Sequence, residues 1–188
     1  MEHIDIKALA LALGATNAGW LPTSKIPFDP VLRKACEANT CGSYGKTYAC
    51  PPHVGEVDAL IARAKAYDGF LLYQTVGLLE DSFDVEGMAE AGKRHKTLTR
   101  ALHDALYGKL PGLLMLSGGG CTLCAACGAT SGEPCRFPDK VIPSISCYCI
   151  EVSKAAAYAG LKYHSGANTV TFFGGVFAPE GYREKRSD

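Results

Sequence analysis

Apolar residues recur at every third or fourth position over several stretches of the chain, which is the spacing of one face of a helix. The longest of these stretches is residues 85–107, where Ala91, Leu98 and Leu102 fall on the same side. The complete set of predicted helices is residues 4–13, 31–38, 57–66 and 85–107, with a last helix that starts at Ser144 or Val152 and ends at Ala159.

Two continuous apolar runs, residues 70–76 and 113–116, have the length and composition of buried strands. The segment of residues 15–30 contains three prolines and has room for one short strand only. These runs therefore predict strands that are buried in the core of the domain.

The C-terminal part of the chain has the pattern of a closing hairpin. Residues 161–165 and 169–173 are the two expected strands, and Gly166, Ala167 and Asn168 supply the turn between them. The pair Gly174-Gly175 is expected to form a turn after the last strand.

The predicted order is strand, long helix, strand, helix, strand, strand. This order indicates an α/β fold, an α+β sandwich with helices packed on a mixed sheet in a ferredoxin-like split βαβ arrangement. A chain of 188 residues suits one domain, residues 1–188. Cysteine-rich loops at about residues 36–54 and 117–143 interrupt it.

Charge and cysteine content narrow the possible functions. Lys+Arg and Asp+Glu both number 19, and a neutral chain has no overall field to hold nucleic acid. The N-terminal apolar stretch, residues 8–13, is too short to cross a membrane, so we expect a cytoplasmic protein without a membrane partner. In that reducing compartment the nine cysteines indicate metal binding or thiol chemistry ahead of disulfides.

The strongest chemical motif is Cys121-x2-Cys124-x2-Cys127, which puts three thiols on one tight loop. This is the arrangement that holds three corners of a cubane iron–sulfur cluster, and Cys135 is the candidate fourth ligand. In bacterial ferredoxins the fourth cysteine follows after three residues and directly precedes proline, whereas here Pro138 comes three residues after Cys135. Zinc is the alternative, although its structural sites usually use two separated Cys-x2-Cys pairs.

Three glycines and an arginine flank this motif. Gly118, Gly119 and Gly120 can take positive φ and present successive backbone N–H groups to an anionic cluster. Arg136 can add positive charge beside it. These four residues are therefore the predicted cofactor-binding groups.

A second group of thiols, Cys36-x4-Cys41-x8-Cys50, is followed by two prolines and matches no common zinc knuckle. It predicts a second metal site with three cysteine ligands. Candidates for a fourth ligand are Cys147, Cys149 and His53. Two alternatives stay open: the site has no fourth protein ligand, which leaves one iron open, or Cys147 and Cys149 are only small buried apolar residues.

Both cysteine motifs and their neighbours, from Cys36 to Pro52 and from Ser117 to Pro138, resemble a family of prokaryotic predicted metal-binding proteins, domain of unknown function 2284. The resemblance implies metal binding in a prokaryote, often one with anaerobic metabolism, and no known reaction. Its cysteine pattern includes Cys36, Cys41, Cys50, Cys121, Cys124, Cys127 and Cys135, but not Cys147 or Cys149.

Three hypotheses follow. The first is an electron-transfer protein or redox accessory with one or two 4Fe–4S clusters, whose partner is a redox protein or a small molecule. The second is an enzyme with an open iron at the three-cysteine site, near Tyr44 or Lys46. The third is a zinc-stabilised interaction module. A homo-oligomer is compatible with each of them.

Overall fold

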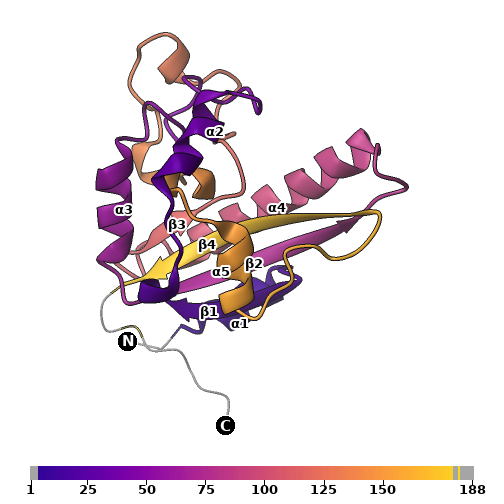
Figure 1. The fold of residues 1–188 in the computed structure, drawn as a ribbon. Helices are drawn as coiled ribbons and strands as arrows, with labels where there is room; N and C mark the ends of the chain where they lie inside the picture. The colour runs from indigo at the N-terminus through magenta and orange to yellow at the C-terminus, as the bar shows by residue number, and fades with distance from the viewer. Residues whose placement is uncertain (1–3, 180–181, 183–188) are drawn as a thin grey trace.

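Four strands form one sheet in the order β1-β2-β4-β3 in the computed structural model, which describes residues 4–179 and 182 (Figure 1). The strands are β1 (Asn17–Pro22), β2 (Gly69–Leu78), β3 (Leu114–Leu116) and β4 (Thr169–Ala178). Every neighbouring pair of these strands is antiparallel. The expectation of a mixed sheet is therefore wrong. Residues 1–3, 180–181 and 183–188 of the expected domain lie outside the described residues.

The α-helices are α1 (Ile6–Ala12), α2 (Arg33–Glu37), α3 (Val57–Lys65), α4 (Val85–Leu106) and α5 (Val152–Tyr158). Short 3-10 helices are η1 (Thr23–Lys25), η2 (Pro30–Leu32), η3 (Gly128–Thr130), η4 (Pro138–Lys140) and η5 (Ile145–Tyr148). Over the part of the chain that the structure describes, no helix combines the length and the apolar character needed to cross a membrane.

The expected split βαβ unit is confirmed. Strand β4 pairs antiparallel with both β2 and β3, so β2 and β3 run in the same direction with β4 between them, and α4 connects them. Strand β1 extends the sheet beyond β2, and α1 precedes it in the chain. Compared with the ferredoxin-like order, the outer strand and its helix therefore come first in the sequence.

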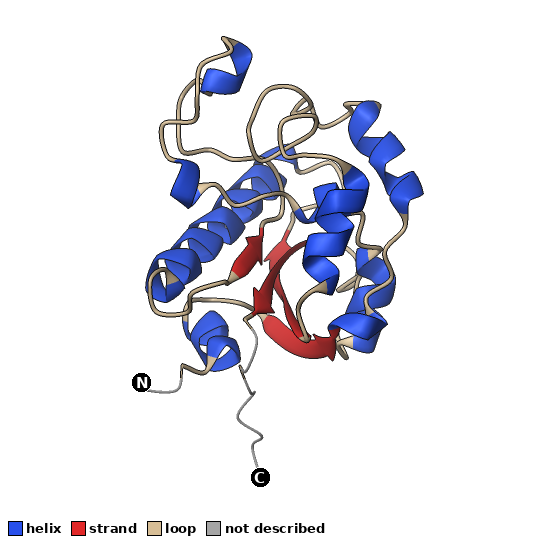
Figure 2. Cartoon of the chain, turned by 90° about the vertical axis from the view of Figure 1, so that its left-hand side faces the viewer, coloured by secondary structure: helices blue, strands red, loops and turns tan. Residues whose placement is uncertain are grey.

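Helices cover both faces of the sheet (Figure 2). Along β2, Leu71 and Tyr73 point to one face and pack against α1 and α4, in a core that includes Leu98 of α4. Phe70 and Leu72 point to the other face, into a core shared with η5, α3 and α5. This double burial explains why β2 is apolar throughout.

The expected C-terminal hairpin is wrong. No strand lies in residues 161–165, and β4 continues to Ala178 because it pairs with β2 along its whole length. Since β4 has β2 on one side and β3 on the other, it has no free edge for a hairpin partner. Gly174 and Gly175 are not a turn either. They lie inside β4, where a Cβ atom on either residue would collide with the ring of Tyr73 or Phe70.

The last predicted helix is two separate elements. The 3-10 helix η5 ends at Tyr148, Cys149 after it has a left-handed φ of 53°, and α5 begins only at Val152. Cys147 and Cys149 therefore do not lie on one regular helix.

Candidate metal centre

The two cysteine loops pack against each other at one end of the sheet, where Figure 1 shows α2 and the loop that follows β3 together. The backbone N–H of Ser144 donates to the carbonyl of Ala49 over 3.1 Å, and Ser117 forms an isolated β-bridge with Ser144. Tyr48 adds a second connection, since its hydroxyl donates to the carbonyl of Glu133 over 2.6 Å. Sequence segments far apart in the chain therefore form one continuous region.

Four cysteines line one cavity of about 270 Å³ in this region. Cys36 comes from α2, Cys41 and Cys50 from the loop that follows it, and Cys147 from η5. Cys50 and Cys147 are buried, Cys36 is half-buried and Cys41 is exposed. The structure thus brings the three cysteines of the first motif together with a fourth from a distant segment.

Cys147 interacts directly with the thiols of the first motif. Hydrogen bonding by the Cys147 side chain lowers the pKa of Cys50 to about 6, with Thr47 acting in the same direction and burial opposing both. The same hydrogen bond, and after it burial, raises the pKa of Cys147. The shift favours the thiolate form of Cys50 over that of Cys147, and a thiolate is the form that binds metals.

Arg33 places a buried positive charge beside these thiols. It lies one turn before Cys36 in α2, and its Nη2 donates to the carbonyls of Gly55 (3.2 Å) and Cys147 (3.4 Å). Burial raises the pKa of Cys36 and of Cys149, and the charge of Arg33 opposes the shift in both. Among the described residues no carboxylate forms an ion pair with Arg33, so its partners are carbonyls and thiols.

Gly118, Gly119 and Gly120, here called the glycine turn, line the cavity that the cysteines of the first motif surround. The sequence allowed positive φ at all three glycines, but of the three only Gly119 adopts it, with a φ of 122°. A Cβ at Gly118 would lie 2.9 Å from the carbonyl oxygen of Phe173, and one at Gly120 would lie 3.7 Å from Sγ of Cys50. Gly118 is therefore required by close packing, while Gly119 is required by its backbone conformation.

Cys121, Cys124, Cys127 and Cys135 form the second group, and all four are half-buried. Burial raises the pKa of Cys121, the charges of Cys127 and Cys135 raise it further, and the N–H of Leu123 and the charge of Arg100 oppose the shift. Cys127 and Cys135 therefore lie close enough to Cys121 to act on its thiol.

The return of the chain to Cys135 depends on Gly128. A Cβ at this buried glycine would lie 2.6 Å from the carbonyl oxygen of Glu133, and the N–H of Glu133 donates to the carbonyl of Gly128 over 2.9 Å. Residues 128–134 therefore fold back on themselves, and Cys135 returns toward Cys127.

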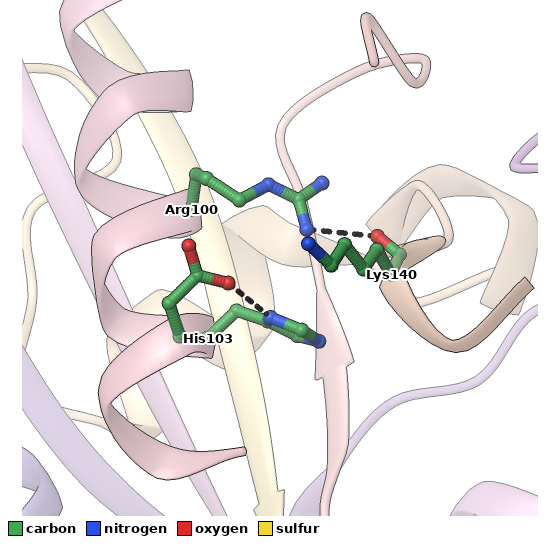
Figure 3. Close-up of polar contacts among 4 residues, drawn as sticks. Arg100, His103 and Lys140 are labelled. Carbon is green, nitrogen blue, oxygen red and sulfur yellow. Dashed lines mark hydrogen bonds and ion pairs between the residues drawn. The ribbon is translucent and has the colours of Figure 1, made fainter. Parts of the chain in front are cut away.

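The cation that acts on Cys121 is Arg100 of α4, which the sequence did not single out. Figure 3 shows Arg100 beside Lys140, where its Nη1 donates to the Lys140 carbonyl over 2.8 Å. Arg136, the predicted cation, is exposed. Spacing along the chain gave no signal for Arg100, because α4 meets the cysteine loop only in the folded protein.

The other candidates for a fourth ligand lie elsewhere. His53 lines a different cavity, its Nε2 is 3.3 Å from the carbonyl oxygen of Gly45, and its ring contacts Tyr48. Cys149 is fully buried behind η5 and does not line the four-cysteine cavity. Cys147 is thus the candidate that the structure places at the cavity.

Within residues 4–179 and 182, no three His, Cys, Asp or Glu side chains lie close enough to hold a single metal ion. The first group of cysteines instead surrounds a cavity. The donor set is chemically uniform, because every candidate ligand of both groups is a soft thiol, which suits iron–sulfur clusters and zinc.

Comparisons with known proteins are consistent with this donor set. No curated protein and no solved structure gives a significant match. A family description, "Predicted metal-binding protein (DUF2284)", matches residues 19–178, which include both cysteine groups. The chain belongs to this family of predicted metal-binding proteins.

Proposed function

We propose that this protein binds two 4Fe–4S clusters and acts in electron transfer or as a redox accessory. The first cluster is held by Cys36, Cys41, Cys50 and Cys147, and the second by the four cysteines of the loop after β3. The observation that carries the proposal is a cavity lined by four cysteines, three from the first motif and one, Cys147, from a distant segment. Each cluster supplies reversible one-electron reduction when bound.

The size of the cavity supports a group of several atoms. A water molecule occupies about 30 Å³ in the liquid, and the cavity of about 270 Å³ is several times larger. A lone zinc ion with zinc–sulfur distances of about 2.3 Å needs much less space. The open-iron alternative gains less support, because Cys147 supplies a fourth thiol at the cavity.

The residues around the cavity suit an anionic occupant. Arg33 is 8% exposed and forms no ion pair with a carboxylate among the described residues, so its positive charge is available to a cluster with four thiolate ligands. A Cβ on Gly120 would lie 3.3 Å from Oγ of Ser43 and 3.7 Å from Sγ of Cys50, so the backbone of Gly120 lies close to this thiol. Arg100 provides the corresponding charge for the second group.

The test is the iron, zinc and acid-labile sulfide content of protein purified without oxygen, combined with EPR after dithionite reduction. We expect about eight iron and eight sulfide per chain, as two cubanes require, with an EPR signal that appears on reduction. Zinc without sulfide in anaerobic protein would reject the proposal in favour of the zinc-stabilised module. Anaerobic handling matters because zinc can occupy vacated thiolate sites.

A matched pair of variants tests the ligand assignment. Cys147→Ala should lose about half of the iron and sulfide, because only the first cluster is affected. Cys149→Ala removes an equally buried thiol that does not line the cavity, so it should keep the full content. Equal metal content in the two variants would show that Cys147 is not a ligand. Circular dichroism of both variants checks that they are folded.

A further inference from the structure

A cavity of about 930 Å³ lies between α4 and the loop that follows β3, on the other side of the glycine turn from the four-cysteine cavity. Its walls include Lys93, Lys96 and Arg100 of α4 and Cys121 of the loop. The size lies in the upper part of the range of small-molecule sites, about 300–1,000 Å³.

The charges in this cavity are unbalanced although the chain as a whole is neutral. Lys93, Lys96 and Arg100 follow at intervals of three and four residues, so they lie along one face of α4. The one acidic side chain among the described wall residues is Asp104, whose Oδ1 is hydrogen-bonded to Nδ1 of His103 over 2.9 Å, the dashed line at His103 in Figure 3. Three cations therefore outnumber the single carboxylate of the wall.

Most of this positive charge has no partner. Lys93 is 3.9 Å from Glu90, a distance that stabilises little at an exposed position. Over the described residues no carboxylate pairs with Lys96 or Arg100. Arg100 acts on Cys121, but neither lysine is among the groups that influence that thiol. Arg100 therefore has a role beside the second cysteine group, whereas Lys93 and Lys96 have no such role there.

The remaining walls are largely apolar. Phe172 lies against Gly92, where a Cβ would be 3.2 Å from its ring, and Leu123 and Ile142 complete the apolar part. Lys96 reaches across to the glycine turn, with its Cε 3.8 Å from the position of a Cβ on Gly119. The cationic groups and the apolar surface therefore meet next to Cys121.

We infer that this cavity binds a small organic anion, with a carboxylate or phosphate held by Lys93 and Lys96 and an apolar body against Phe172. A concave site with apolar walls and a few converging charged groups is the usual form of a small-molecule site. Arginine and lysine are the common partners of carboxylates and phosphates. The inference does not depend on the proposed clusters.

Titration calorimetry with benzoate, phenyl phosphate and neutral benzamide, at constant ionic strength, tests it. We expect saturable binding of at least one anion and none of benzamide, which has the same ring without the charge. The tighter of the two anions identifies the charged group as carboxylate or phosphate. Absence of saturable binding by either anion, or binding of benzamide as tight as that of benzoate, overturns the inference.

Variants locate the site. Lys96→Gln should weaken anion binding about tenfold, the usual effect of losing one charge-assisted hydrogen bond. Lys162→Gln, at an exposed lysine outside this cavity, should bind as the wild type does. Equal affinity of Lys96→Gln and wild type contradicts the site. Because iron is measured in the same samples, failure of the cluster proposal would be recognised separately from failure of anion binding.

Discussion

His95 of α4 is a buried histidine whose environment makes stability depend on pH. It is 0% exposed, and its ring lies between those of Tyr73 and Phe172. Its Nδ1 is 2.9 Å from Oγ1 of Thr75, and the backbone carbonyl of Phe173 acts on the ring in the direction that raises its pKa, against the larger effect of burial. Burial lowers the pKa of His95 from 6.5 to about 4, so the folded protein holds a neutral imidazole at neutral pH.

The sign of the pH effect follows from proton uptake in the two states. Between pH 6.5 and pH 4 the unfolded chain binds a proton at His95 that the folded protein does not bind. The stability contributed by the neutral ring is therefore fully present above pH 6.5 and is lost as the pH falls toward 4. The difference between the two pKa values corresponds to about 3 kcal/mol in total, of which about 2 kcal/mol is lost by pH 5.

Urea unfolding at about pH 7.5 and about pH 5 measures this loss in wild type and in His95→Leu. We expect the wild type to lose about 2 kcal/mol more than His95→Leu over this interval, because the variant has no imidazole to protonate. Leu98→Ala, a core change in the same helix, should cost about 2–5 kcal/mol at both pH values and keep the wild-type pH dependence. If His95→Leu and wild type lose the same stability on acidification, the linkage to His95 is wrong.

Three further variants test the surroundings of the cysteines. Arg33→Met removes the buried cation of the first group, so metal should be lost to a chelator faster than in Arg136→Met, which changes an exposed arginine. Equal rates would argue against charge compensation by Arg33. Gly118→Ala would place a Cβ 2.9 Å from the backbone of β4 and should lower stability by about 1–3 kcal/mol in urea unfolding; wild-type stability would refute the close packing. Tyr48→Phe removes the hydrogen bond between the two loops and should weaken local stability by about 1 kcal/mol. The measurement is amide hydrogen exchange, which should become faster in residues 128–135 of the variant. An unchanged exchange rate there would show that this hydrogen bond does not stabilise the loop.

Elements with a strong internal pattern were predicted well from the sequence. The helix expected at residues 85–107 is α4 (Val85–Leu106), and the run at residues 70–76 lies inside β2 (Gly69–Leu78). In both, the signal repeats within one continuous stretch, so local geometry alone defines the element. The hairpin at residues 161–173 failed because strand pairing depends on which edges are free, and β4 has both edges occupied.

The candidate site divides in the same way. The Cys121, Cys124 and Cys127 motif could be recognised because its ligands lie on one short loop. Cys147 could only be one of several candidates, because it lies 98 residues from Ala49, to whose carbonyl its thiol donates. Arg100 could not be found from spacing at all, since it reaches the cysteine loop from another element.

The sequence by itself determined the helices and strands with regular apolar spacing, the two groups of thiols and the metal-binding family. Only the tertiary structure decided the order of the strands, the place of Cys147 beside Cys50, and the positions of Arg33 and Arg100 among the thiols. The physical reason is that periodicity and motif spacing are properties of neighbouring residues. The charge and burial that surround a thiol come instead from segments that packing brings together.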